Sequence, residues 1–235
     1  MEQKLEENLD KPKSKLKRID HLYITHEIQH FLHFDKGIFI TIKNLLIKPG
    51  KTIREFLFEN RDKYVKPVFF LLVSAVIFSL IIQFFHLKIE FFNINSIEEL
   101  KGKVRSKEIG EWTNKNIGYA QLIMGIFIAF WIKLFFKKFK YNIYEILVLL
   151  SYVLGEALLI LGLFIFIANI FKSEFIATVG IIIYFVYIVW AIGQFFGETK
   201  PINYLKSILV YLFGNATYLI VLLLISYLLK FILLR

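Results

Sequence analysis

The sequence has 235 residues, of which 57% are hydrophobic, and the mean hydropathy is +0.60. Soluble domains are about 45–50% apolar, and the excess here is gathered into long runs, so the composition predicts an all-α membrane protein and excludes an ordinary soluble domain. The net charge of +10 does not indicate nucleic-acid binding, because the basic residues flank the apolar runs, and a chain without cysteine has no disulfide, no Cys-ligated metal and no thiol nucleophile.

The first 66 residues contain 14 Lys and Arg and precede the first long apolar run. Residues 1–24 form a charged tail that lacks the apolar stretch of about 7–15 residues found in a signal peptide. We therefore expect the amino terminus to lie in the cytoplasm.

Residues 25–66 are predicted to form two juxtamembrane amphipathic helices joined by a turn at Pro49-Gly50. Thr52 and Glu55 have the spacing of a capping box for the second helix. The predicted apolar faces consist of Ile38, Phe39, Ile42, Leu45 and Leu46 in the first helix and Ile53, Phe56 and Leu57 in the second. We expect this hairpin to lie on the inner leaflet, with its basic residues attracted to anionic lipids. These residues are Lys43, Lys48, Lys51, Arg54, Arg61 and Lys63.

Residues 67–235 are predicted to form a membrane domain of about five transmembrane helices, with an outer loop at 86–116. A span needs about 20 residues, and five apolar segments come close to or exceed that length. They are Pro67–Phe85, Ile117–Phe136, Ile143–Phe171, Phe175–Phe196 and Tyr204–Leu234. Three residues at 172–174 separate the third and fourth segments, so a tight hairpin is favoured, while one long bent helix stays open. In the outer loop, Ser96 and Glu99 predict a helix cap.

The distribution of basic residues predicts the orientation. With the amino terminus inside, 20 Lys and Arg fall on the inner side and nine on the outer side. Short loops rich in Lys and Arg stay on the cytoplasmic side of the membrane. We therefore expect a cytoplasmic amino terminus and an external carboxyl terminus.

Glu156 lies near the middle of the third apolar segment, with no Lys or Arg in the same segment. A charge at that depth costs about 2.5–3.5 kcal/mol or more, so the carboxyl group is expected to be neutral, paired or hydrated. Tyr152 lies one turn earlier on the same helical face and can donate a hydrogen bond to it. Gln121, Gln194 and Asn215 are the polar side chains that other spans offer. Two interpretations stay open: a carboxylate that handles protons or cations, and a neutral side chain that joins helices.

His26, His30 and His33 share one helical face, which makes them weak candidates for a metal site. No supporting carboxylate pattern accompanies them, so we expect no metal and no cofactor. The sequence contains no nucleophile elbow, phosphate-binding loop or HExxH motif. It therefore predicts a protein that is not an enzyme.

The juxtamembrane segment resembles a known protein family. The residues that carry the resemblance are Phe34-Asp35-Lys36-Gly37, Thr41, Lys48-Pro49-Gly50, Ile53-Arg54-Glu55, Arg61, Lys63-Tyr64 and Pro67. They resemble the signature of the domain-of-unknown-function family 3667, and Tyr141-Asn142 with Tyr144-Glu145 and residues 195–206 are similar as well. The resemblance implies a polytopic protein of the bacterial inner membrane. Family members commonly begin with a Cys-x-x-Cys zinc ribbon, which this chain lacks.

These observations predict a membrane scaffold or assembly partner without covalent chemistry, either as a homo-oligomer or with another membrane protein. The alternative is a small channel or transporter that uses Glu156. A polar cavity reaching Glu156 would favour transport, and a dry, packed third span would favour the scaffold.

Overall fold

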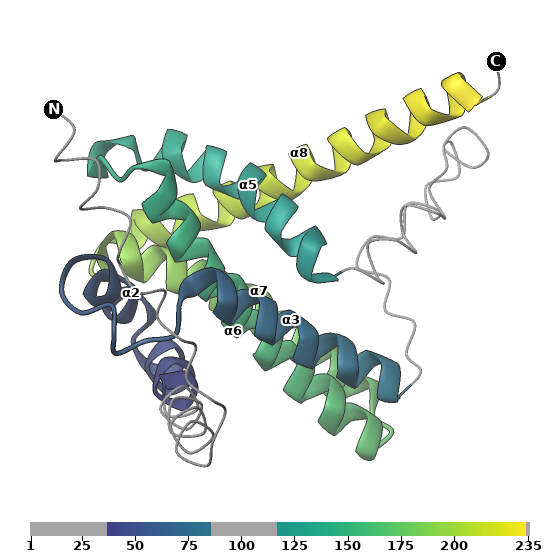
Figure 1. The fold of residues 1–235 in the computed structure, drawn as a ribbon, viewed down its shortest axis with the longest axis horizontal. Helices are drawn as coiled ribbons and strands as arrows, with labels where there is room; N and C mark the ends of the chain where they lie inside the picture. Colours follow the sequence, from purple (N-terminus) through teal and green to yellow (C-terminus); the bar gives the residue numbers. More distant parts are fainter. Residues whose placement is uncertain (1–36, 86–116, 234–235) are drawn as a thin grey trace, which may run out of the picture. The chain divides into compact units, whose positions relative to one another are not determined.

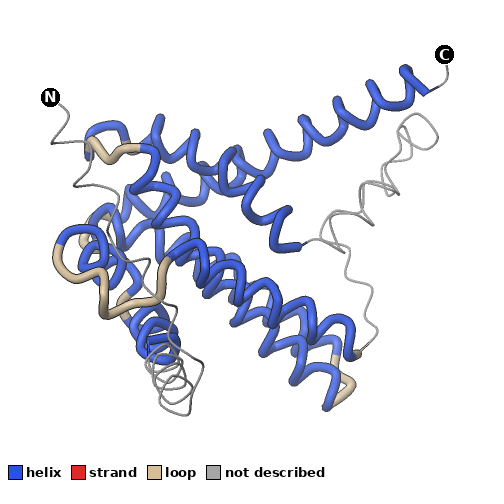
Figure 2. Tube along the Cα trace, in the orientation of Figure 1, coloured by secondary structure: helices blue, strands red, loops and turns tan. Residues whose placement is uncertain are grey.

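Long apolar runs fold into α-helices because lipid offers no hydrogen bonds to the backbone, so each N–H and C=O must be bonded within its own segment. The structure is a computed structural model that describes residues 37–85 and 117–233, all within the unit Gly37–Arg235. Within these ranges the chain consists of helices and short connections, without a strand (Figure 2). The tail 1–24, the three candidate histidines and the outer loop lie outside the described residues, so the expectations for them stay predictions.

The juxtamembrane part contains two consecutive helices. The helix Gly37–Ile47 is interrupted at Lys48, and α2 (Pro49–Phe58) follows with proline in its first turn, where a missing N–H costs nothing. Because α2 begins before Thr52, the predicted capping box is wrong. The Thr52 hydroxyl instead donates to the carbonyl oxygens of Lys48, at 2.8 Å, and Asn44, at 3.1 Å.

Five long helices follow at the predicted places. They are α3 (Pro67–Phe84), α5 (Ile117–Phe135), α6 (Ile143–Ile170), α7 (Glu174–Gly197) and α8 (Pro201–Leu233), with a short 3-10 helix, η5 (Lys137–Phe139), after α5. In the described residues, four of them (α3, α6, α7 and the Pro201–Ile225 part of α8) are long and apolar enough to cross a membrane, and Tyr119–Phe135 forms a shorter apolar helix. The all-α class with about five spans is confirmed.

The third and fourth apolar segments are two helices rather than one bent helix. The turn between α6 and α7 includes Lys172, whose φ of 49° lies in the left-handed region, which is typical of a residue that ends a helix. Helix α6 begins with a capping box in which the backbone N–H of Glu145 donates to Asn142 Oδ1 and the N–H of Asn142 donates to Glu145 Oε2. Its start is thus encoded locally.

Helix α6 occupies the centre of the described bundle. It packs against α3, α7, α5 and α2, while α8 packs against α5 and α7 (Figure 1). Residues 149–158 are all buried. Ten consecutive residues cover every side of a helix with 3.6 residues per turn, so α6 is enclosed by protein at this level.

Small residues allow the helices to pack closely. A Cβ atom added at Gly155 of α6 would lie 2.9 Å from a ring carbon of Phe70 and 3.2 Å from the Cα of Leu71, both in α3. A Cβ atom added at Gly214 of α8 would lie 2.5 Å from a side-chain carbon of Ile128 in α5. Helices that approach this closely gain van der Waals contact within the membrane.

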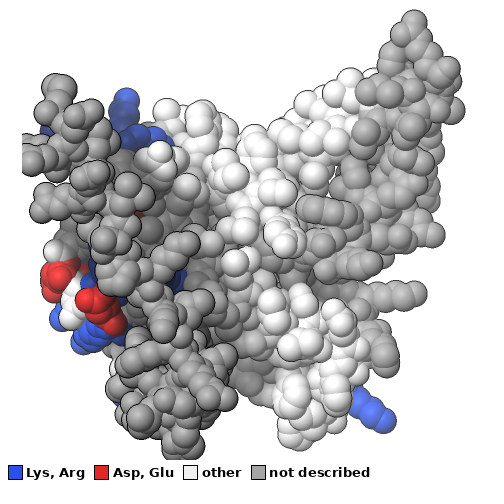
Figure 3. Space-filling view, in the orientation of Figure 1, with Lys and Arg blue, Asp and Glu red and all other residues white. Residues whose placement is uncertain are grey.

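The connections between spans bring three basic segments to one end of the bundle, called here the basic end. Helices α3, α5, α6 and α7 alternate in direction, so residues 43–66, 133–145 and 198–206 lie at the same end. In Figure 3 most of the coloured charges gather on the left, over α2 and neighbouring turns, whereas the broad central face is white. This separation of charged and apolar surface fits a protein that spans a bilayer.

Candidate functional site: the docked segment and Glu156

Residues 37–66, called here the docked segment, pack one set of their apolar side chains against protein. Leu45 and Ile53 are 0% exposed, and Phe56 and Val65 are also buried. The partners include α6 and α7, because α2 packs against both helices and the Phe56 ring meets the Tyr152 ring edge to face at 5.3 Å between centroids. The predicted Ile53, Phe56 and Leu57 face is confirmed as buried. This face packs on α6 and α7 rather than on lipid, and the expectation that the hairpin lies on the inner leaflet stays a prediction.

Helix α7 holds the docked segment through its carboxyl-terminal turns. The backbone N–H of Gly50 donates to Gln194 Oε1 at 2.7 Å. Arg54 Nη1 donates to the carbonyl oxygens of Gln194, at 3.0 Å, and Phe195, at 2.8 Å. The last carbonyls of a helix lack hydrogen-bond donors within the helix and carry partial negative charge. A guanidinium group at this end supplies both the donors and a positive charge. Arg54, predicted as a lipid contact, therefore contacts protein.

Gly50 has to be a glycine for this contact to form. A Cβ atom there would lie 2.6 Å from the Gln194 carbonyl carbon and 2.7 Å from the Phe195 nitrogen, both backbone atoms. Backbone cannot move aside as a flexible side chain can. The Pro49-Gly50 pair therefore both starts α2 and allows α2 to approach α7.

Two tyrosines bond the docked segment from the spans. The Tyr152 hydroxyl of α6 donates to the Val65 carbonyl oxygen at 2.5 Å, and the Tyr187 hydroxyl of α7 donates to the Leu45 carbonyl oxygen at 3.2 Å. The Val65 N–H donates to the Thr41 hydroxyl at 3.1 Å. These bonds satisfy backbone groups that would otherwise be buried unpaired, at a cost of about 1–3 kcal/mol each.

Glu55 fixes the connection between α2 and α3. Lys63 Nζ donates to Glu55 Oε1 at 2.6 Å, and the Tyr64 hydroxyl donates to Oε2 at 2.8 Å. The hydrogen bond from Lys63 lowers the pKa of the Glu55 carboxyl, and the same bond raises the pKa of Lys63. Burial, followed by the bond to Glu55, raises the pKa of Tyr64. Lys63, predicted as a lipid contact, thus forms a partly exposed ion pair with Glu55.

Glu156 is enclosed in the bundle, with 1% of its surface exposed. Its Oε2 atom has no hydrogen-bond partner among the described residues. The expected bond from Tyr152 does not form, because that hydroxyl reaches the docked segment instead. The neighbouring Gly155 meets Phe70 and Leu71, the fourth and fifth residues of α3. Glu156 therefore lies near the middle of α6. Along the bundle it lies level with the second turn of α3, close to the basic end.

The other predicted polar residues form separate contacts rather than one cluster around Glu156. Gln121 Nε2 donates to the Tyr184 hydroxyl at 3.1 Å, and Asn215 Nδ2 donates to the carbonyl oxygen of Tyr211 in its own helix at 2.8 Å. Gln194 accepts from Gly50 in the docked segment. Within the described ranges no group of three His, Asp or Glu residues has a geometry that could hold a metal ion.

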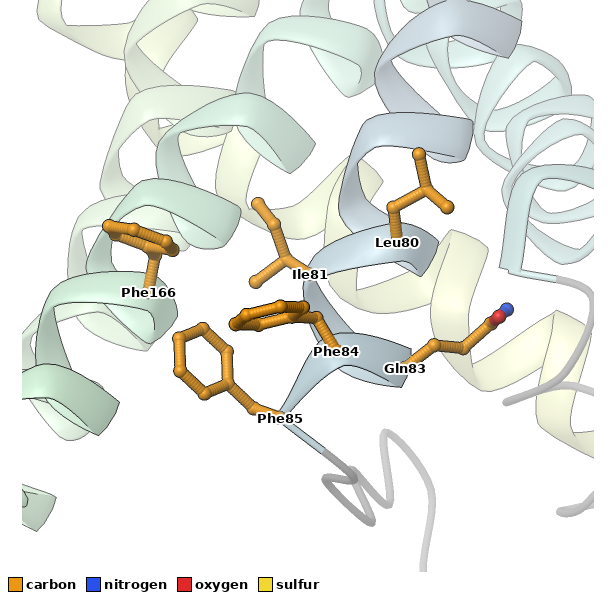
Figure 4. Close-up of a pocket in the computed structure, with 6 residues that line it drawn as sticks. All are labelled: Leu80, Ile81, Gln83, Phe84, Phe85 and Phe166. Carbon is orange, nitrogen blue, oxygen red and sulfur yellow. The ribbon is translucent and has the colours of Figure 1, made fainter.

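An apolar pocket of about 510 Å³ lies at the end of α3, away from Glu156. Its lining is Leu80, Ile81, Gln83, Phe84, Phe85 and Phe166 (Figure 4). The rings of Phe85 and Phe166 meet edge to face at 5.6 Å between centroids, and the amide of Gln83 points away from the aromatic rings. The pocket therefore provides no polar route to Glu156.

The apolar helices and the enclosed α6 define a multi-pass, all-α membrane protein. Residues 35–79 match the model of a family described as "Protein of unknown function (DUF3667)". The match confirms the resemblance and covers the docked segment together with most of α3. No curated protein and no solved structure matches the chain.

In the structure, the residues of the motif make the contacts that fix the docked segment. Gly50 and Arg54 bind α7, Thr41 accepts from Val65, and Glu55 binds Lys63 and Tyr64. Sequence reasoning assigned none of them to a protein contact and missed Tyr187 altogether. The available signal was the motif itself, because Thr41, Gly50, Arg54, Glu55, Lys63 and Tyr64 all belong to it.

Proposed function

We propose that the chain is a non-enzymatic scaffold or assembly partner of the bacterial inner membrane, with its basic end in the cytoplasm. The observation that carries the proposal is the closed packing around Glu156. Residues 149–158 are buried on every side, and the apolar pocket lies at the opposite end of α3 from the docked segment. A transport path through the bundle would need an open polar route to Glu156, whereas Glu156 is 1% exposed and lies in a part of α6 that protein encloses on every side.

Wide apolar faces support a role in assembly. Val76, Leu80, Ile182, Val186 and Leu212 are all more than half exposed, and they lie on three different spans. Faces of this kind contact lipid or other membrane helices. A second copy of the chain or another membrane protein is the partner that we propose.

A flux assay separates the scaffold from the channel. Liposomes containing the purified protein and a trapped pH-sensitive dye should acidify no faster than empty liposomes after a pH jump. Glu156→Gln, which keeps the shape and removes the titration, should behave as the parent does in both flux and thermal stability. Proton flux that the parent shows and Glu156→Gln abolishes would replace the scaffold with the transporter.

The partner is tested in the membrane itself. A photo-crosslinker placed at Val186 should yield a defined dimer or a defined heteromeric product, and reciprocal tagging of the crosslinked protein should recover this chain. The same group at the enclosed Leu158 serves as the control that cannot reach a partner. Products that are equally diffuse at both positions would contradict a specific assembly.

A further inference from the structure

The helix Gly37–Ile47 has two apolar faces, and only one of them is covered. Thr41 and Leu45, one turn apart, are 0% exposed on the face turned to the bundle. Phe39 is 73% exposed and Ile47 is 55% exposed. The outer stripe, as we call it, consists of Phe39, Ile40, Lys43, Leu46 and Ile47, all of them exposed.

The spacing of the outer stripe makes it one continuous surface. Residues at i, i+1, i+4, i+7 and i+8 share one side of an α-helix. Four of the five are large apolar side chains, and the fifth is a lysine, whose alkyl chain can follow apolar surface while its ammonium group reaches a polar layer. An exposed apolar surface of this kind marks a contact with lipid or protein.

Two observations select lipid as the contact. Thr41, on the covered face, accepts from the N–H of Val65, two residues before α3 begins, so the helix lies at the level where this span begins. The docked segment contains seven Lys and Arg, among them the exposed Lys48, Lys51 and Lys66, against three acidic residues, of which Glu55 is paired with Lys63. The segment that carries the stripe therefore has a net positive charge.

We infer that the outer stripe is a membrane-interface surface. Phe39, Ile40, Leu46 and Ile47 insert at the boundary of the acyl chains, and Lys43, Lys48 and Lys51 contact anionic phospholipid headgroups. The side chains that contact lipid are thus those of the outer stripe and not those on the face of Leu45. Helix α2 packs its apolar face on α7 and not on the leaflet. The inference depends on the membrane-spanning bundle and not on the scaffold role.

The absence of cysteine allows a direct test with single spin labels on the full-length protein in vesicles. Phe39→Cys reports the stripe. Asp62→Cys, exposed in the turn before α3, serves as the water reference, and Val186→Cys, 61% exposed on α7, serves as the lipid reference. Collisions with oxygen, which concentrates in lipid, and with a water-soluble nickel complex are measured for each label.

The label at Phe39 should collide more often with oxygen and less often with nickel than the label at Asp62, and it should lie at a shallower depth than the label at Val186. Nickel collisions equal to those at Asp62 would overturn the inference by placing the stripe in water. Protection from both reagents would also overturn it, because another part of the chain or a second copy would then cover the stripe.

Headgroup preference is tested with spin-labelled phosphatidylglycerol and phosphatidylcholine competing for the protein surface. The parent should prefer phosphatidylglycerol. In the triple variant Lys43→Gln/Lys48→Gln/Lys51→Gln this preference should fall by up to about fivefold for each lysine that lies near the surface. The decrease should be smaller at high salt. Lys172→Gln, at the other end of the bundle, should change it little. A preference that the triple variant retains would exclude these lysines as the headgroup contacts.

Discussion

Helices α6 and α8 are almost equally apolar, but the protein uses them in opposite ways. In the most apolar window of α6, 72% of the residues are buried inside the protein, against 22% in α8. The difference lies in the neighbours, because α6 packs against α2, α3, α5 and α7, whereas α8 packs against α5 and α7. Hydropathy thus reports that a segment can enter the bilayer, whereas its place among the other helices decides whether lipid or protein surrounds it.

The docked segment extends this contrast to the basic end of the bundle. It packs against α6 and α7, whose tyrosines bond its backbone. Helix α8 has no such cover over residues 220–228, where Ile220, Leu224, Tyr227 and Leu228 are all more than half exposed. Substitutions in the enclosed part should therefore destabilise the protein much more than matched substitutions in α8.

The largest expected effect comes from Gly155→Leu. The added side chain would overlap the Phe70 ring and the backbone at Leu71, so the variant should lose about 3 kcal/mol of stability or fail to fold. Ala216→Leu, on the exposed face of α8, is the matched control and should stay within about 0.5 kcal/mol of the parent. Thermal unfolding in nanodiscs measures both, and equal losses would erase the contrast between the two helices.

Arg54→Gln should lower the free energy of unfolding by about 2 kcal/mol, because two carbonyl groups at the end of α7 lose a charged donor. Arg61→Gln is the control, since the exposed Arg61 makes one longer bond of 3.4 Å to Leu57. The same melting experiment applies, and limited proteolysis between residues 37 and 66 should accelerate in Arg54→Gln alone. An Arg54 variant as stable as the Arg61 variant would show that the apolar contacts hold α2 by themselves.

Tyr152→Phe removes one hydroxyl group and leaves the buried Val65 carbonyl without its donor, so we expect a loss of about 1.5 kcal/mol. Tyr227→Phe makes the same chemical change on an exposed face of α8 and should have almost no effect. The difference between the two melting temperatures is the quantity of interest. A negligible difference would mean that water replaces the tyrosine at Val65.

The smallest effect concerns pH. The folded pKa of Glu55 lies below its ordinary value of 4.5, mainly because Lys63 donates to it, so the ion pair stabilises the fold at neutral pH and this contribution disappears as the pH falls through the lowered pKa. The loss should stay below about 1 kcal/mol because the pair is partly exposed to solvent. Glu55→Gln should reduce the change in melting temperature between neutral and acidic pH, whereas Glu59→Gln, on the exposed side, should preserve it. A pH response that Glu55→Gln leaves intact would assign it to another group.

The positions of the spans could be predicted from the sequence because they depend on local properties. Runs of about 20 apolar residues, Pro67 at a helix start and the three-residue break at 172–174 each act within a few turns of helix. All five apolar segments fold as separate helices, whose first and last residues differ from the predicted ones by at most three positions. The motif that carries the family resemblance could likewise be identified without the structure.

Tertiary structure alone decided what each side of these helices contacts. Leu45 and Phe39 were predicted on one apolar face, but the bundle buries Leu45 and leaves Phe39 exposed. Tyr152 is spaced to reach Glu156, but the Val65 carbonyl oxygen takes its hydrogen bond. The physical reason is the same in both cases: an apolar or hydrogen-bonding group can be satisfied by several partners, and the choice depends on segments that are far away in the sequence and adjacent only in the folded chain.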